Sequence, residues 1–171
     1  MASGDIIGIL HSDDYFASEE TISRIVEKFS ADGKKTDGIY GDLVYVKTFP
    51  QEKIIRYWKS NPFKYENLKK GWMPPHNTLF LRKEVYDKHG KFDISFKIAS
   101  DIDFMIKVFS DETLRLEYLP EIITKMRVGG VSNKPCNFIL KNKEYLEVIR
   151  RNKIGGFPTL ISKLASKMKQ Y

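Results

Sequence analysis

Two adjacent carboxylates, Asp13 and Asp14, follow a short apolar run at residues 6–10 that is rich in β-branched side chains. Such a run is typical of a buried strand, and in open α/β sheets ligands bind at the carboxyl ends of the strands. Neighbouring carboxylates repel each other unless a cation neutralises them. Their oxygens suit Mg²⁺ or Mn²⁺, ions that usually accompany phosphates. The pair is therefore a candidate metal site, with an ordinary turn as the alternative.

A second acidic candidate, Asp101, is expected in the first turn of a helix and beside a loop mouth. The helix is predicted by apolar residues at helical spacing: Ile102, Met105, Ile106 and Phe109. Structural roles also account for the acidic residues of this segment. Ser100 can cap the helix with Asp103 as its capping-box partner, and Asp103 can also pair with Lys107. Because Asp101 can simply complement the helix dipole, these residues alone favour the structural roles.

Two loops could bind a ligand. Residues 127–134 contain Gly129 and Gly130, so backbone N–H groups together with Arg127 or Lys134 could approach a diphosphate. A mobile connection is the alternative. Residues 59–77 are irregular and aromatic, and they end in Met73-Pro74-Pro75-His76-Asn77. Such a segment either shapes a binding surface or forms a flap packed by its own aromatic side chains.

Strand-like and helical segments alternate along the chain, which predicts an α/β fold around these candidates. Strands are expected at residues 38–46, 54–58, 78–81, 116–120 and 122–126, and helices at residues 18–31, 83–89 and 137–152, with Ser18 as a cap and Gly90 as a stop. The residues from 160 onwards form a basic amphipathic end. This end could dock on the domain or lie on an anionic membrane surface.

Composition limits the class of protein. The 171 residues suffice for one domain with a substantial core, and 42% hydrophobic with 30% charged residues is typical of soluble globular proteins. No window approaches the ~18 uninterrupted apolar residues of a membrane span, and the first residues do not resemble a signal peptide. Cys136 is the only cysteine, which predicts a reducing, cytoplasmic compartment. The net charge of +7 favours anionic partners such as nucleotides, phospholipid surfaces or nucleic acid.

In their order and spacing, these pieces resemble the inverting glycosyltransferases of family 2, which have the nucleotide-sugar GT-A fold. The resemblance covers roughly residues 2 to 135, in the segments Ala2-Ser3-Gly4-Asp5, Ile9-Leu10-His11-Ser12-Asp13-Asp14, Tyr40-Gly41-Asp42, His76-Asn77-Thr78-Leu79-Phe80-Leu81-Arg82, Gly90-Lys91-Phe92-Asp93, Ala99-Ser100-Asp101-Ile102-Asp103-Phe104 and Arg127-Val128-Gly129-Gly130-Val131-Ser132. It implies a partial GT-A fold, a mixed sheet flanked by helices, over residues 1–135. Residues 136–171 would then be basic amphipathic helices that pack on this domain or on a membrane surface.

The resemblance also implies roles for the candidate residues. Asp13 and Asp14 would hold Mn²⁺ or Mg²⁺ on the diphosphate of the sugar donor, with Asp14 the expected direct ligand. Asp101 would be the catalytic base that takes the proton from the acceptor hydroxyl. His76 and the loop formed by Arg127, Gly129, Gly130 and Ser132 would lie near the donor phosphates or the acceptor.

By the same resemblance, the protein would transfer a sugar with inversion from a nucleotide-diphosphate donor, most simply a UDP-sugar. The acceptor would be a glycan or a lipid-linked molecule in bacterial-type cell-surface polysaccharide or lipopolysaccharide synthesis. The location would be cytoplasmic, or the inner face of the membrane if the C-terminal helices bind lipid.

The chain departs from the family in three places. His11 stands where the family often has Asn or Asp, and Ser100 stands where an acidic residue usually precedes the base. The strand–helix–strand–helix segment that holds the nucleobase in the family has no counterpart before residue 6. The strand at residues 6–10 would then have an exposed edge, which predicts self-association and weak or undetectable transferase activity of this chain alone.

Two other functions are open at this stage. A non-catalytic sugar- or nucleotide-binding module would keep the same residues without turnover. A basic nucleic-acid-binding protein fits the charge, but the aromatic and basic residues do not interleave as a stacking platform would.

Overall fold

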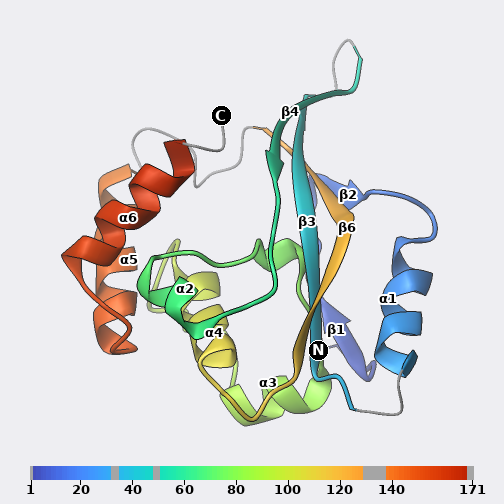
Figure 1. Cartoon of the computed structure of the whole chain (residues 1–171), viewed down its shortest axis with the longest axis horizontal. Helices are drawn as coiled ribbons and strands as arrows, with labels where there is room; N and C mark the ends of the chain where they lie inside the picture. The colour runs from blue at the N-terminus through green and yellow to red at the C-terminus, as the bar shows by residue number, and fades with distance from the viewer. Residues whose placement is uncertain (1, 32–34, 48–50, 129–137, 169–171) are drawn as a thin grey trace.

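The computed structural model describes residues 2–31, 35–47, 51–128 and 138–168. Within these residues, a six-stranded mixed sheet has the strand order β1-β5-β3-β6-β2, with β4 paired to β3 (Figure 1). The strands are β1 (Ile6–Gly8), β2 (Asp14–Phe16), β3 (Gly38–Lys47), β4 (Lys53–Trp58), β5 (Phe80–Arg82) and β6 (Leu116–Arg127). The helices are α1 (Thr21–Ser30), α2 (Tyr65–Lys69), α3 (Lys83–His89), α4 (Ser100–Phe109), α5 (Phe138–Arg151) and α6 (Phe157–Met168), with a short 3₁₀ helix η2 (His76–Thr78). The predicted α/β class, with a mixed sheet flanked by helices and a helical C-terminal end, is confirmed.

Strand β3 lies at the centre of the sheet. It runs parallel to β6 and antiparallel to β4 and β5, which gives the sheet its mixed character. Residues 38–46 are all buried because elements cover both faces: Figure 1 shows α1 on one side and α4, α5 and α6 on the other. Gly41 permits close packing here, since a Cβ atom would lie 2.6 Å from Ile123 Cδ1 and 2.8 Å from the Glu121 carbonyl oxygen.

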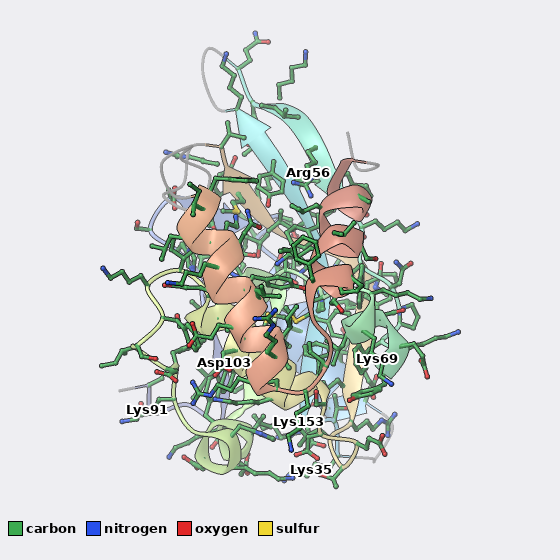
Figure 2. All side chains as sticks on the ribbon, turned by 90° about the vertical axis from the view of Figure 1, so that its left-hand side faces the viewer. Lys35, Arg56, Lys69, Lys91, Asp103 and Lys153 are labelled. Atoms are coloured by element: carbon green, nitrogen blue, oxygen red, sulfur yellow. The ribbon has the colours of Figure 1, made fainter. Side chains whose placement is uncertain are left out.

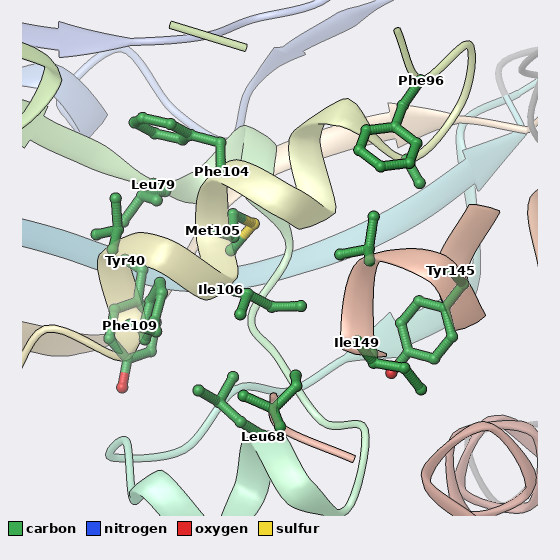
Figure 3. Packing of buried hydrophobic residues seen from close by; sticks show 14 of the residues in the cluster. Tyr40, Leu68, Leu79, Phe96, Phe104, Met105, Ile106, Phe109, Tyr145 and Ile149 are labelled. Carbon is green, nitrogen blue, oxygen red and sulfur yellow. The ribbon is translucent and has the colours of Figure 1, made fainter. Parts of the chain in front are cut away.

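Alternate residues of β3 serve the two faces of the sheet. Ile39 packs in a small cluster with Ile25 and Phe29 of α1. Tyr40 belongs to the larger cluster, which is built around α4 and shown in Figure 3 together with Leu68, Leu79, Phe104, Ile106 and Phe109. The period-2 alternation of a strand thus divides the core into two parts.

Helices α5 and α6 complete the larger cluster. Tyr145, Ile149 and Leu160 are buried in it, so both helices dock on the sheet domain. Figure 2 views this face, with α5 and α6 in front of the sheet and charged side chains pointing outward. In the described part of the chain, no helix is long and apolar enough to cross a membrane.

Two strand predictions need correction. The run at residues 6–10 was expected to be a buried strand, but β1 has three residues and lies at the end of the sheet, with Ile6 and Ile7 only partly buried. The segments 116–120 and 122–126 form one strand, β6, whose pairing to β3 shifts register opposite residues 40–43. Strand β6 keeps its direction through these shifts. Pro120 therefore interrupts the pairing of β6 with β3 without ending the strand.

The residues suggested as helix N-caps, Ser18 and Ser100, do not cap their helices. Helix α1 begins at Thr21, and Ser18 does not cap it; instead the Ser18 N–H donates to Thr21 Oγ1 at 3.1 Å. Helix α4 begins at Ser100, so the position before it is Ala99. Asp103 makes no capping box, because its side chain turns to other partners.

One end of the sheet, formed by β1, is exposed beside α1 (Figure 1). Among the described residues β1 pairs only with β5, and Ile22 and Val26 of the adjacent α1 are 42% and 48% exposed. We expect the chain to self-associate through this surface, since unpaired edges and apolar patches attract another chain. Light scattering coupled to size-exclusion chromatography should show a mass above that of the 19.9 kDa monomer.

The double variant Ile22→Lys with Val26→Lys should shift the population toward the monomer. The control is Ile94→Lys, which changes a side chain outside this surface that is 94% exposed. It should leave the measured mass unchanged. A clean monomer of the unsubstituted chain at high concentration would contradict the prediction.

Candidate functional site

Asp14 lies at the start of β2 in an unusual environment for a carboxylate. It is 7% exposed; its Oδ2 accepts a hydrogen bond from Asn77 Nδ2 at 2.7 Å, and its buried Oδ1 has no hydrogen-bond partner among the described residues. Burial raises the pKa of Asp14 above its ordinary value, and the charge of neighbouring Asp13 adds to this, against the opposing effects of Asn77 and of His11 and His76. The site therefore has an acceptor oxygen and a negative charge that a cation would neutralise.

Residues 11–14 form the turn that was the structural alternative, with the Asp14 N–H donating to the His11 carbonyl oxygen at 3.0 Å. The turn leaves Asp13 exposed and Asp14 buried. The predicted turn is therefore present and places the acidic pair after the end of β1, while the metal site stays a prediction.

Asp101 lies in the first turn of α4 and belongs to a hydrogen-bonded chain of side chains. Its Oδ2 is 3.0 Å from His76 Nδ1, and His76 Nε2 is 3.0 Å from His11 Nε2. Burial alone would raise the pKa of Asp101. The hydrogen bond and charge of His76, the Ile102 N–H and the charge of Lys163 outweigh burial and hold the pKa below its ordinary value. Because its pKa is lowered, Asp101 is ionised at neutral pH, as a proton acceptor must be. Its side chain is 29% exposed.

Two consecutive residues of η2 connect the acidic pair to the candidate base: His76 contacts Asp101, and Asn77 contacts Asp14. The backbone at this point is fixed by a side chain of β6 and by a hydrogen bond from η2 to the backbone of β3. The Thr124 hydroxyl donates to the Asn77 carbonyl oxygen at 2.8 Å, and the Thr78 hydroxyl lies 3.1 Å from the Gly41 carbonyl oxygen. The central strands thus hold η2 in place between the two acidic groups.

A divalent ion is compatible with the acidic pair. In the described residues, no group of three or more His, Cys, Asp or Glu side chains could hold a metal by itself. Mg²⁺ and similar ions, however, commonly bind one or two carboxylates and take their other ligands from phosphates and water. The Oδ1 atom of Asp14, which is buried without a hydrogen-bond partner among the described residues, and the exposed carboxylate of Asp13 are the oxygens that could bind an ion arriving with a diphosphate.

The other predicted binding residues are only partly placed. Arg127 ends β6, the strand that pairs with β2, and its guanidinium lies 6.0 Å from the centre of the Tyr15 ring. It is therefore next to the strand that carries Asp14. Gly129, Gly130 and Ser132 lie outside the described residues.

Glu144 of α5 was missed by the sequence analysis. It is 7% exposed, and its carboxylate accepts hydrogen bonds from the backbone N–H groups of Lys97 (3.0 Å), Ile98 (2.8 Å) and Ala99 (3.0 Å). Burial acts to raise the pKa of Glu144, but the three N–H groups hold it below its ordinary value. Glu144 thereby fixes the segment that leads directly into Asp101. In the sequence it is one charged residue of a basic helix, so no local signal identifies it.

Glu144→Gln is expected to lower the free energy of unfolding by about 2 kcal/mol, because an amide offers one acceptor oxygen where three donors converge. The lowered pKa means that the stabilisation is complete above the unfolded pKa near 4.5 and is lost as the pH falls through the folded value. Chemical denaturation at pH 7 and at low pH measures both effects. Glu147→Gln, on the exposed side of the same helix, is the matched control and should change stability by less than about 0.5 kcal/mol.

The fold is similar to that of TarS from S. aureus. One TarS structure aligns with a TM-score of 0.59 at 18% identity, covering 88% of this chain and 40% of TarS 1–349. A second, of TarS 1–349 in complex with UDP, aligns with a TM-score of 0.54 at 16% identity over the same shares of the two chains. At this identity the likeness establishes the fold.

Curated relatives add a likeness in sequence. A PGL/p-HBAD biosynthesis glycosyltransferase of Mycobacterium tuberculosis is 23% identical over 148 residues, which are 86% of this chain and 53% of the relative. An uncharacterized glycosyltransferase of the same species is 27% identical over 110 residues, which are 62% of this chain and 39% of the relative. No protein-family model matches. The chain thus spans about half the length of the curated relatives it matches, and these relatives are named glycosyltransferases.

Proposed function

We propose that this chain carries the metal-binding and catalytic-base portion of an inverting glycosyltransferase with a GT-A fold, as in family 2. The observation that carries the proposal is the pair His76 and Asn77, which brings a candidate base and a candidate metal ligand together from distant parts of the sequence. The named relatives and the fold of a protein that binds UDP support it. The proposed donor is a UDP-sugar. The proposed acceptor is a glycan or lipid-linked molecule of bacterial surface synthesis, reached from the cytoplasm.

In the proposed reaction, Asp101 takes the proton from the acceptor hydroxyl as that oxygen attacks the anomeric carbon. The bond from the anomeric carbon to the diphosphate breaks on the opposite face, and the nucleotide diphosphate leaves with the bonding electrons. Asp13 and Asp14 would hold Mg²⁺ or Mn²⁺, which supplies electrostatic stabilisation of the departing diphosphate. His76 fixes the orientation of the Asp101 carboxylate through its 3.0 Å contact.

Titration calorimetry with UDP in the presence and absence of Mn²⁺ tests the proposal, after circular dichroism has shown that the sample is folded. We expect heat of binding that requires Mn²⁺ and disappears in Asp14→Ala. Inorganic diphosphate is the matched probe for the diphosphate contacts without the nucleoside. A folded chain that gives no heat with UDP or with diphosphate would argue against a working donor site in this chain.

A further inference from the structure

Helix α6 packs on the domain through one face, which includes Thr159, Leu160 and Lys163. Thr159 and Leu160 are buried, and Lys163 Nζ lies 3.2 Å from the centre of the Tyr145 ring. Gly71 permits this close approach, because a Cβ atom there would lie 2.8 Å from Lys163 Cβ and 2.8 Å from the Thr159 carbonyl oxygen. The rotation of α6 about its own axis is therefore set by close contacts of this inward face.

The opposite face of α6 is apolar and exposed. Phe157, Ile161 and Leu164 recur at helical spacing, and they are 59%, 53% and 38% exposed. Pro158 and Ala165, which are exposed as well, lie on the same side of the helix, and we call this set of residues the α6 stripe. Because the inward face is fixed by its own contacts, the helix does not turn the α6 stripe toward the core. Contiguous apolar surface that stays exposed marks an interaction site.

The chain around the α6 stripe is cationic. From residue 148 to residue 171 the sequence contains six Lys or Arg residues and no Asp or Glu. Two of the six, Arg151 and Lys163, contact other side chains of the domain. The other four flank the α6 stripe in the sequence: Arg150, Lys153, Lys167 and Lys169. Charge of one sign on both sides of an apolar stripe favours an anionic partner.

An apolar helix face between cationic segments fits the surface of an anionic bilayer. The apolar side chains of such a helix enter the boundary between headgroups and acyl chains, while Lys and Arg side chains reach the phosphate groups. Each Lys or Arg close to an anionic leaflet adds to the attraction. A second copy of the chain matches the stripe less well, because its net charge of +7 would be brought against charge of the same sign.

We propose that α6 binds the surface of an anionic phospholipid bilayer through the α6 stripe while its inward face stays on the domain. One helix then serves both roles considered for the C-terminal end, docking and membrane contact. Lys163 of the inward face lines a pocket together with Asp101 and His76. Binding to a bilayer therefore brings this pocket close to the membrane. On the function proposed above, a lipid-linked acceptor would reach Asp101 there.

Co-sedimentation with lipid vesicles measures this binding. The vesicles consist of phosphatidylcholine alone or of phosphatidylcholine mixed with phosphatidylglycerol, and both kinds are titrated at the same ionic strength. We expect the affinity for the anionic vesicles to exceed that for the neutral vesicles by about tenfold or more. Equal affinity for the two kinds, or no binding of the folded chain to either, would overturn the inference.

Ile161→Ser with Leu164→Ser should lower the affinity for the anionic vesicles by about tenfold or more, since two apolar side chains no longer enter the interface. Both side chains are exposed, so circular dichroism should show an unchanged fold. Ile94→Ser changes an exposed apolar side chain outside α6 and is the matched control. Equal affinity of the double variant and the control would mean that net charge alone drives the binding, and it would also overturn the inference.

Arg150→Gln with Lys153→Gln tests the charge next to the α6 stripe. Both side chains are exposed, and their loss should lower the affinity for the anionic vesicles by about tenfold while leaving that for neutral vesicles unchanged. Lys83→Gln with Lys91→Gln removes two exposed lysines outside residues 148–171 and should have a much smaller effect. Equal losses in the two pairs would show that the position of the charge is immaterial and would contradict binding through α6.

Light scattering coupled to size-exclusion chromatography distinguishes a bilayer from a second copy of the chain as the partner. Without lipid, Ile161→Ser with Leu164→Ser should leave the measured mass unchanged. A lower mass in this variant would identify the α6 stripe as an interface between copies and would overturn the inference. Vesicle binding requires neither UDP nor turnover, so its outcome is separate from that of the donor site.

Discussion

Asp101→Asn is expected to lower the rate of sugar transfer by about 10²–10⁴-fold, the usual contribution of a general base. Asparagine keeps the shape of the side chain, and its one oxygen can still accept the hydrogen bond from the Ile102 N–H, while its NH₂ group takes the place of the oxygen that now contacts His76. It does not take a proton from the acceptor hydroxyl. Mn²⁺-dependent binding of UDP should therefore be unchanged while turnover is lost.

The rate is measured as UDP released from a UDP-sugar in long incubations. Asp103→Asn, two residues further along α4, is the matched control. Asp103 is fully buried and binds Asn152 Nδ2 at 2.8 Å and Lys107 Nζ at 2.5 Å, so its loss should reduce stability more than rate. Equal losses of rate in both variants would show that the lower rate comes from loss of folded protein and not from loss of a base. An unchanged rate in Asp101→Asn would favour a non-catalytic binding module.

The lowered pKa of Asp101 predicts how the transfer rate and the stability of the fold depend on pH. Because it is held below the ordinary value of 3.8, the base stays ionised throughout the neutral range and the transfer rate should not fall there through its protonation. The ionised form also stabilises the folded state above the unfolded pKa, and this contribution is lost as the pH falls through the lowered value.

Asp14→Asn is expected to abolish the stabilisation of the protein by Mn²⁺ and UDP. A ligand present at a hundredfold excess over its Kd stabilises the folded state by about 2.7 kcal/mol, and this shift in thermal unfolding should be absent in the variant. Without ligand, the same variant should be at least as stable as the unsubstituted chain at neutral pH. The reason is that it replaces a buried charge whose Oδ1 lacks a hydrogen-bond partner among the described residues.

The raised pKa of Asp14 gives the sign of the pH effect. Ionisation of a group whose folded pKa is raised destabilises the folded state, so the cost is absent below the unfolded pKa of about 3.8 and grows as the pH rises through the folded value. The advantage of Asp14→Asn over the unsubstituted chain should therefore disappear in acid. Asp13→Asn, at an exposed position, should weaken the metal effect but change ligand-free stability by less than about 0.5 kcal/mol. A ligand-induced shift that survives in Asp14→Asn would contradict the proposed donor site.

Most of the fold could be predicted because its signals are local. Strand β3 and helix α3 agree with their apolar patterns, and Gly90 ends α3 with a positive φ of 80° as expected. The predicted pair of Asp103 and Lys107 is also present. The exposure of β1 could not be predicted from its own apolar residues, because burial depends on what lies beside a strand.

The candidate site was predictable only in part. Asp13, Asp14, His76 and Asp101 were selected by type and order, and the structure brings them to one place. The roles of Asn77 and Glu144 depend on partners that are distant in the sequence, so their own neighbours give no signal. The same holds for Asp42 of β3, which is a buried acceptor for the Tyr57 and Tyr118 hydroxyls and for the Ser60 N–H.

The two acidic parts of the site differ in how firmly the sheet holds them. Asp14 belongs to β2, a three-residue strand at the end of the sheet that pairs with β6 alone among the described strands, while Asp101 belongs to a helix packed in the large core. Short edge strands open at low free-energy cost, whereas core helices open only with the whole domain. Amide hydrogens of residues 14–16 should therefore exchange with solvent much faster than those of α4. The side of the site proposed for the donor is therefore the part expected to open first.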